Sequence, residues 1–116
     1  MVRMTIDAKA QPEKRGEFLD AMISLQKERL AEQGINLSKV YESDEDKTRF
    51  LVIDEWESDE DLQRFFLKSG FRVLLGALRT LCTEAEIKYD PLRTEMSTLN
   101  LNRFHSVIER KSSKPL

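Results

Sequence analysis

Residues 49–81, RFLVIDEWESDEDLQRFFLKSGFRVLLGALRTL, decide the fold. Apolar, β-branched and aromatic residues dominate 48–57, and this composition predicts a strand. Ser58 follows as a helix N-cap, and Asp61 stands three residues later, a spacing close to that of a capping box. The stretch therefore predicts a strand that passes directly into a helix, with an interruption of that helix near Gly70.

The helix after the strand has one apolar side. Its apolar residues recur three and four positions apart, which is the spacing of a helix that packs one face on a core. They are Leu62, Phe65, Phe66, Phe71, Leu74, Leu75 and Leu78.

The residues before this stretch predict a second strand–helix unit. Apolar and polar residues alternate over 2–8, which is the pattern of a strand with one apolar side. Pro12 suits the first turn of a helix, and Gly34 is expected at its C-cap. Between them, apolar residues recur at helical spacing: Phe18, Met22, Leu25 and Leu30.

Two further strands complete the pattern. Residues 36–42 predict a strand joined by the polar turn 43–47 to the strand at 48–57, as an antiparallel hairpin, and 84–89 predict a last strand. The order is β-α-β-β-α-β. This order predicts an α+β, ferredoxin-like fold with a four-stranded antiparallel sheet and both helices on one face, in residues 1–90.

Residues 91–116 form a C-terminal extension in this interpretation. Their apolar content is too high for a purely disordered tail. Residues 103–110 are expected to form a short helix or a strand that packs on a partner subunit. His105 would then approach the pocket of either subunit and supply an acid/base group.

One face of the sheet is left uncovered by this arrangement. When the residues Val2, Met4 and Ile6 face the helices, Asp7 faces away from them, and both sides of the strand 48–57 are partly apolar. A second copy of the chain is the simplest cover for the exposed side. The sequence predicts a homodimer joined through the sheet faces; the alternative is a monomer with scattered surface aromatics.

Composition limits the function classes. The 116 residues include 19 basic and 21 acidic side chains, a net charge of −2, which gives no general attraction for nucleic acid or for an anionic membrane. No signal peptide or membrane-spanning run is visible, and the single cysteine, Cys82, suits a reducing compartment. A cytoplasmic location is expected. Cys/His clusters with metal-ligand spacing are absent, so no metal is expected.

Four stretches carry a resemblance to a known family. They are RMTI (3–6), PEKR (12–15), VIDEWES (52–58) and FRVLLGAL (71–78). From about residue 2 to residue 89, the chain resembles the antibiotic biosynthesis monooxygenase (ABM) family of dimeric α/β barrels. The resemblance implies a homodimer with a ligand site in each subunit, between the sheet and the helices.

The resemblance also implies several activities. Members include oxygenases without a cofactor, acting on quinols and polyketide aromatics, and haem-degrading enzymes. Many members place a histidine in the helix after the Trp-Glu-Ser junction, and Phe65 stands at that position here. Because no histidine occurs before His105, haem degradation is not expected and no cofactor is predicted.

The strand carboxylates are the candidate catalytic residues. An acidic aromatic substrate that loses a proton can pass an electron to oxygen by itself, so the protein must supply a dry pocket, a base and a donor for the oxyanion. Asp54 and Asp7 are the candidate bases, with donors from Arg3, Lys39 and Tyr41. The alternative role for these groups is an ion pair or hydrogen bond at the dimer interface.

A set of large apolar residues is the candidate ligand pocket: Trp56, Phe65, Phe66, Phe71 and Leu75. The alternative for them is ordinary core packing. Two functions remain open. The first is a cofactor-independent monooxygenase of a small aromatic or quinol-like substrate. The second is a non-catalytic homodimer that binds a small ligand or another protein.

Overall fold

The computed structural model describes the backbone of residues 1–91 and 97–100 and the side chains of residues 1–90. The first four strands and the helical regions between them follow one another in the predicted order. The elements are β1 (Val2–Ala10), the 3₁₀ helix η1 (Pro12–Lys14), α1 (Arg15–Arg29), β2 (Ile35–Glu42), β3 (Arg49–Trp56), α2 (Asp59–Phe66), α3 (Ser69–Leu81), β4 (Cys82–Pro91) and β5 (Ser97–Asn100).

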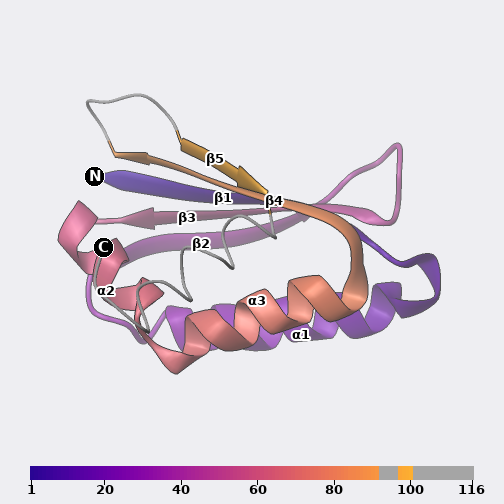
Figure 1. The fold of residues 1–116 in the computed structure, drawn as a ribbon, viewed down its shortest axis with the longest axis horizontal. Helices are drawn as coiled ribbons and strands as arrows, with labels where there is room; N and C mark the ends of the chain where they lie inside the picture. The colour runs from indigo at the N-terminus through magenta and orange to yellow at the C-terminus, as the bar shows by residue number, and fades with distance from the viewer. Residues whose placement is uncertain (92–96, 101–116) are drawn as a thin grey trace.

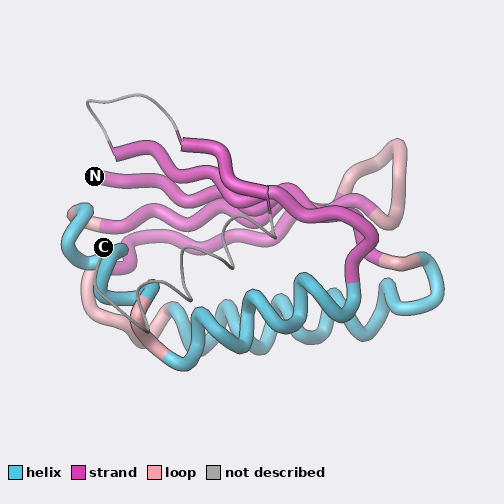
Figure 2. The backbone as a smooth tube through the Cα atoms, in the orientation of Figure 1, coloured by secondary structure: helices cyan, strands magenta, loops and turns pink. Residues whose placement is uncertain are grey.

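The strands form one antiparallel sheet in the order β2-β3-β1-β4-β5. Its first four strands have the ferredoxin-like order, and α1 and α3 lie side by side on one face of the sheet (Figures 1 and 2). The predicted fold class is therefore confirmed. The fifth strand, β5, was not predicted; its backbone pairs with β4 inside the segment interpreted as a C-terminal extension.

The sheet has one buried and one exposed side, as the alternation predicts. In β1, the residues Val2, Met4, Ile6, Ala8 and Ala10 are buried, and in β3 the buried residues are Phe50, Val52, Asp54 and Trp56. Cross-strand register aligns these two sets, for example Met4 with Asp54. The helices lie on the buried side (Figure 2), and none of the described helices lies on the other side of the sheet.

Helix α1 ends earlier than the sequence predicts. Its last residue is Arg29, with Leu30 at the C-cap. Leu30 was expected on the apolar face, but its side chain is 52% exposed. The expectation that Gly34 is the C-cap is also wrong: Gly34 lies beyond the turn, directly before β2, with φ of 93°. Its left-handed backbone serves the entry into the strand, not the end of the helix.

The second helical region is broken as expected, although not at Gly70. The break lies at Leu67 and Lys68, and Gly70 belongs to the first turn of α3. At the start of α2, the Ser58 hydroxyl accepts a hydrogen bond from the Asp61 backbone N–H at 3.1 Å, which confirms the predicted N-cap. The predictions for 103–110 and His105 lie outside the described residues.

Candidate functional site

The buried side of the sheet carries a polar network contributed by three elements. The carboxylate of Asp54 on β3 lies beside Arg29 on α1, with 2.7 Å between Asp54 Oδ2 and Arg29 Nε. Ser38 on β2 donates its hydroxyl to Asp54 Oδ1 at 2.7 Å, and Arg29 Nη2 donates to the Ser38 Oγ at 3.2 Å. The Nε contact is an ion pair without good hydrogen-bond alignment. The three side chains are at most 8% exposed.

Such a network is an unusual feature inside an apolar core. Removing two charges from water costs several kcal/mol per ion, and well-packed apolar residues are often as stabilising as a buried ion pair. Burial raises the pKa of Asp54, although Arg29 and the Ser38 hydrogen bond act in the opposite direction. A buried carboxylate with a raised pKa is a recognised mark of a functional site.

Two buried nitrogen atoms near this network have no partner among the described residues. They are Arg29 Nη1 and Trp56 Nε1. Arg29 therefore uses one edge of its guanidinium for Asp54 and Ser38, and its remaining nitrogen is left without an acceptor. A buried donor of this kind normally has an acceptor in a functioning protein.

The sequence interpretation named Asp54 and missed Arg29 and Ser38. A signal for Arg29 was present, because Phe18, Met22, Leu25 and Arg29 form one stripe at helical spacing and all four are buried. A charged residue at the end of an apolar stripe requires a buried counter-ion. For Ser38, the only signal was its place opposite Asp54 in the hairpin register.

Asp7, the other predicted base, lies on the opposite side of the sheet. Its carboxylate accepts a hydrogen bond from Arg49 Nη1 at 2.8 Å, and Arg49 Nη2 donates to Glu84 at 2.8 Å. Since Asp54 is on the helix side, the two predicted bases do not converge on one site. A catalytic role for Asp7 would have to use the outer face.

The predicted donors also lie on the outer side. Arg3 pairs with Glu55 at 2.7 Å, and Lys39 and Tyr41 are exposed on β2. None of these three side chains reaches the buried network around Asp54.

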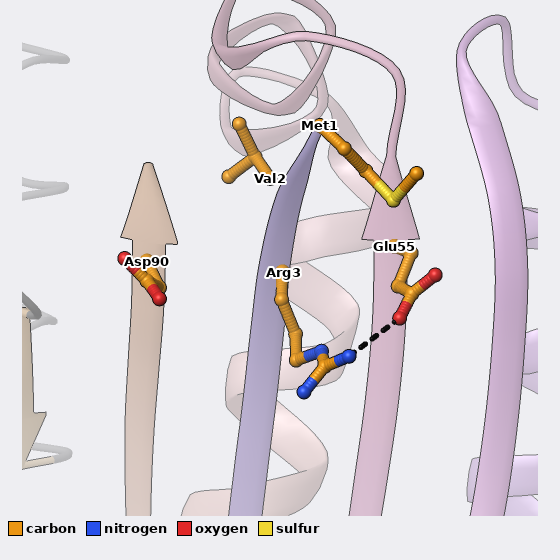
Figure 3. Close-up of a pocket in the computed structure, with 5 residues that line it drawn as sticks. All are labelled: Met1, Val2, Arg3, Glu55 and Asp90. Carbon is orange, nitrogen blue, oxygen red and sulfur yellow. Dashed lines mark hydrogen bonds and ion pairs between the residues drawn. The ribbon is translucent and has the colours of Figure 1, made fainter. Parts of the chain in front are cut away.

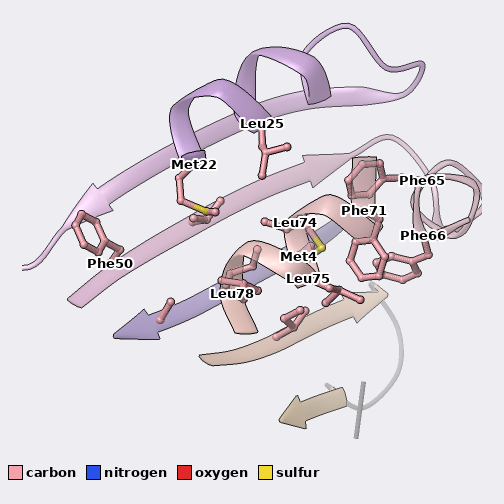
Figure 4. Packing of buried hydrophobic residues seen from close by; sticks show 14 of the residues in the cluster. Met4, Met22, Leu25, Phe50, Phe65, Phe66, Phe71, Leu74, Leu75 and Leu78 are labelled. Carbon is pink, nitrogen blue, oxygen red and sulfur yellow. The ribbon is translucent and has the colours of Figure 1, made fainter. Parts of the chain in front are cut away.

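The predicted pocket residues are all buried, and Phe65, Phe66 and Phe71 lie together at one end of the core (Figure 4). Trp56 and Phe65 are stacked with ring centroids 5.1 Å apart, and Phe71 lies 5.6 Å from Phe65 and 4.8 Å from Phe66. Leu75 is buried as well. The rings contact one another directly, so the geometry is that of a packed aromatic cluster. Its use as a ligand pocket stays a prediction.

Three cavities lie at the edges of this core. A cavity of about 260 Å³ is lined by Met1, Val2, Arg3, Glu55 and Asp90, and Figure 3 shows Arg3 turned toward Glu55. Another, of about 330 Å³, lies at the hairpin end of the sheet beside Asp7, Tyr41 and Arg49. A third, of about 120 Å³, lies where α1 ends and α2 meets α3, and its lining includes Arg29 and Phe65.

A metal site and a reactive thiol have little support in the described part of the chain. Within residues 1–91 and 97–100, no group of three or more His, Cys, Asp and Glu side chains is placed to hold a metal ion. Burial raises the pKa of the Cys82 thiol to about 12, so a reactive thiolate is not favoured there. None of the described helices is both long and apolar enough to cross a membrane.

Comparison with known proteins adds evidence that geometry alone does not contain. The family model described as antibiotic biosynthesis monooxygenase matches residues 1–73, which is more than half of the chain. No curated protein matches the sequence.

Solved structures share the fold. A conserved protein from Methanosarcina mazei is 25% identical, with a TM-score of 0.72 over 78% of this chain and 90% of that one. SnoaB, a cofactor-independent oxygenase from Streptomyces nogalater, is 17% identical, with a TM-score of 0.71 over 81% of this chain and 94% of SnoaB. At that identity, the likeness to SnoaB shows the fold alone.

Proposed function

The chain belongs to the antibiotic biosynthesis monooxygenase family, and we propose on that premise that it is a cofactor-independent monooxygenase of a small aromatic or quinol-like substrate. The observation that carries the proposal is the buried Asp54–Arg29 pair, whose Asp54 lies on the same face of β3 as Trp56. A charged pair is costly in an apolar core, and catalysis is a reason for a core to contain one.

The proposed chemistry needs no reagent other than the substrate and dioxygen. A ring-activated CH₂ group loses one proton to a base, and the resulting carbanion transfers electrons to O₂ and forms a C–O bond. The peroxide takes up a proton and loses water, which leaves C=O in place of CH₂. The substrate gives four electrons, and the two oxygen atoms of O₂ end in the carbonyl group and in water.

Each of the three side chains of the buried network has a proposed role. Asp54 is the proposed base, since a carboxylate with a raised pKa accepts a proton at neutral pH more readily than an exposed one. Arg29 is the proposed donor to the oxyanion, since its Nη1 has no acceptor among the described residues. Ser38 positions Asp54 through the 2.7 Å hydrogen bond.

Oxygen consumption with a panel of hydroquinones and anthrone-like ketones tests the proposal. Asp54→Asn should lower the rate about 10²–10⁴-fold, because an amide cannot accept the proton. Asp20→Asn makes the same change at an exposed position of α1 and should leave the rate unchanged. Asp7→Asn tests the other predicted base. No uptake with any substrate, or full activity in Asp54→Asn, would contradict the proposal.

The second candidate function is a non-catalytic dimer that binds a small ligand or another protein. The observation that favours it is Phe65, which cannot titrate and is stacked on Trp56 where relatives often have a histidine. Saturable ligand binding without oxygen uptake is the result that would support this alternative.

We also propose that the protein is a cytoplasmic homodimer joined through the outer sheet faces. The support is that the described helices α1 and α3 lie on one face of the sheet and that apolar Leu51 and Ile53 of β3 lie on the other, half-buried. Within this proposal, residues 1–90 form the domain and 91–116 extend it, with β5 paired to β4.

A further inference from the structure

Gln26 links helix α1 to the strand that carries Ser38. Its Nε2 donates a hydrogen bond to the backbone carbonyl oxygen of Ser38, with 2.7 Å between the two atoms. Arg29 follows three residues later, on the same side of the helix, and its Nη2 donates to the Ser38 hydroxyl at 3.2 Å. Helix α1 thus holds Ser38 at two atoms, one in the backbone and one in the side chain.

Strand β2 benefits from such a contact at this position. It lies at one edge of the sheet, so β3 is its only neighbour among the described strands. The pairing of β2 with β3 is irregular between Ile35 and Leu37, directly before Ser38. An irregularity of this kind bends a strand and changes the direction of nearby side chains. Strand pairing therefore fixes Ser38 less firmly than it fixes a residue in the middle of the sheet.

The position of Ser38 matters for Asp54. The Ser38 hydroxyl donates to Asp54 Oδ1 at 2.7 Å, and the two residues stand opposite each other in the register. Arg29 on α1 is the charged group that contacts Asp54, and the register neighbour of Asp54 on β1 is the apolar Met4. A hydrogen bond weakens steeply when its geometry is distorted, so a small displacement of β2 would weaken the bond from Ser38.

We propose that Gln26 is a positioning residue for the Asp54 site, which holds the backbone of β2 so that the Ser38 hydroxyl stays directed at Asp54 Oδ1. Gln26 acts through Ser38, whereas Arg29 contacts the carboxylate itself. The importance of this position for catalysis rests on the proposed function. The effect on the Asp54 carboxylate does not, and it can be measured without turnover.

The pKa of Asp54 reports the state of this hydrogen bond. Burial raises the pKa of Asp54, and Arg29 and the hydrogen bond from Ser38 act against burial. A pH titration followed by ¹³C NMR of the Asp54 carboxyl carbon measures it. Gln26→Met keeps the helix propensity and removes the donor, so it should raise the pKa of Asp54 above the wild-type value. Ser24→Met is the matched control at an exposed position of α1 and should leave this pKa unchanged.

The variant Ser38→Ala decides whether Gln26 acts through the hydroxyl group. Ser38→Ala alone should raise the pKa of Asp54 at least as much as Gln26→Met does. When Gln26→Met is added to Ser38→Ala, the pKa should rise no further, because the hydrogen bond that Gln26 positions is already absent. A general loosening of α1 would also act through Arg29, and it would therefore raise the pKa in both backgrounds.

Oxygen uptake tests the consequence for catalysis. Gln26→Met should lower kcat about tenfold and leave KM nearly unchanged, because a small misplacement of a catalytic group is costly. Ser24→Met should keep the wild-type rate.

An unchanged pKa of Asp54 in Gln26→Met, or an equal rise with and without the Ser38 hydroxyl, would overturn the proposal. Wild-type kcat in Gln26→Met would overturn it as well. Failure of the proposed function looks different: the pKa of Asp54 changes as expected in the three variants, while no substrate supports oxygen uptake by the wild type.

Discussion

The carboxylate of Asp61 occupies the space that a side chain on Gly34 would need. A Cβ placed on Gly34 would lie 2.3 Å from Asp61 Cγ, far inside the contact distance. Gly34 also has a φ of 93°, a backbone conformation that residues other than glycine rarely adopt. The start of α2 and the turn before β2 are thus packed together, which couples the two halves of the chain.

Replacement of Gly34 by alanine should therefore be strongly destabilising. The backbone strain and the displacement of Asp61 together should cost about 2 kcal/mol or more. Gly16→Ala is the control, because nothing lies within 4 Å of the added Cβ and α1 gains a better helix former. Urea unfolding measures both variants; equal midpoints for Gly34→Ala and the wild type would refute this interpretation.

The N-cap of α2 should contribute measurably to stability. Ser58→Ala removes the acceptor for the Asp61 N–H and should lower the free energy of unfolding by about 1 kcal/mol. Ser58→Asp should recover much of the loss, since aspartate is an equally good N-cap. Thermal and urea unfolding of the three proteins check the order; a serine-to-alanine change without effect would argue against the cap.

The Arg29–Asp54 pair should behave as a unit. Arg29→Met leaves a buried carboxylate without its counter-ion and should cost about 3–5 kcal/mol. The double variant Arg29→Met/Asp54→Leu removes both charges and should recover most of that loss. A double-mutant cycle by urea unfolding measures the coupling. Additive losses would show that the two groups do not stabilise each other.

The raised pKa of Asp54 predicts a pH dependence of stability. Burial is its main cause, so the folded state binds this proton more tightly than the unfolded chain does. The contribution of Asp54 is therefore most favourable below about pH 4, the unfolded value, and is lost as the pH rises through the folded-state pKa.

Comparison with the variant Arg29→Met/Asp54→Leu isolates this effect. The free energy of unfolding of the wild type minus that of the variant should fall between about pH 4 and the folded-state pKa and then become constant. Other carboxylates, such as Asp61, whose pKa is lowered by hydrogen bonds from Arg64 and Ser58, are present in both proteins. Their contributions therefore cancel in this difference. A difference in unfolding free energy that rises with pH would show that the folded state lowers the pKa of Asp54 and does not raise it.

The dimer proposal predicts that arginine substitutions at two isoleucines affect the mass in solution differently. Ile53→Arg places a charge on the outer face of β3 and should shift the mass in solution from dimer to monomer. Ile23→Arg makes the same change on α1, where the side chain is 41% exposed, and should leave the dimer intact. Light scattering after gel filtration gives the masses. A wild-type monomer, or an unaffected Ile53→Arg dimer, would exclude this interface.

The elements and their order were predictable because they depend on local spacing. The alternation in β1 and the Ser58 cap are properties of neighbouring residues, and both predictions were confirmed. The end of α1 was not predictable in this way. Leu30 continues the apolar pattern, yet α1 ends at Arg29, and the following turn brings Gly34 against Asp61 before β2 begins.

The candidate site was only partly predictable. Asp54 stood out as a carboxylate inside an apolar strand, and the aromatic residues around Trp56 were recognisable from their spacing. The alternation in β1 placed Asp7 on the side away from the helices, but both sides of β3 are partly apolar, so the sequence left the side of Asp54 open. The structure places Asp54 on the buried side, opposite to Asp7.

The sequence by itself determined the β-α-β-β-α-β order, the apolar faces of β1 and of the helices, and the family, since these are encoded in periodicity and short stretches of residues. The tertiary structure alone decided which groups meet. Arg29, Ser38 and Asp54 lie on three different elements, and their contact requires both the β2–β3 register and the docking of α1 on the sheet. Local spacing carries no information about such a meeting, because it results from the packing of whole elements against one another.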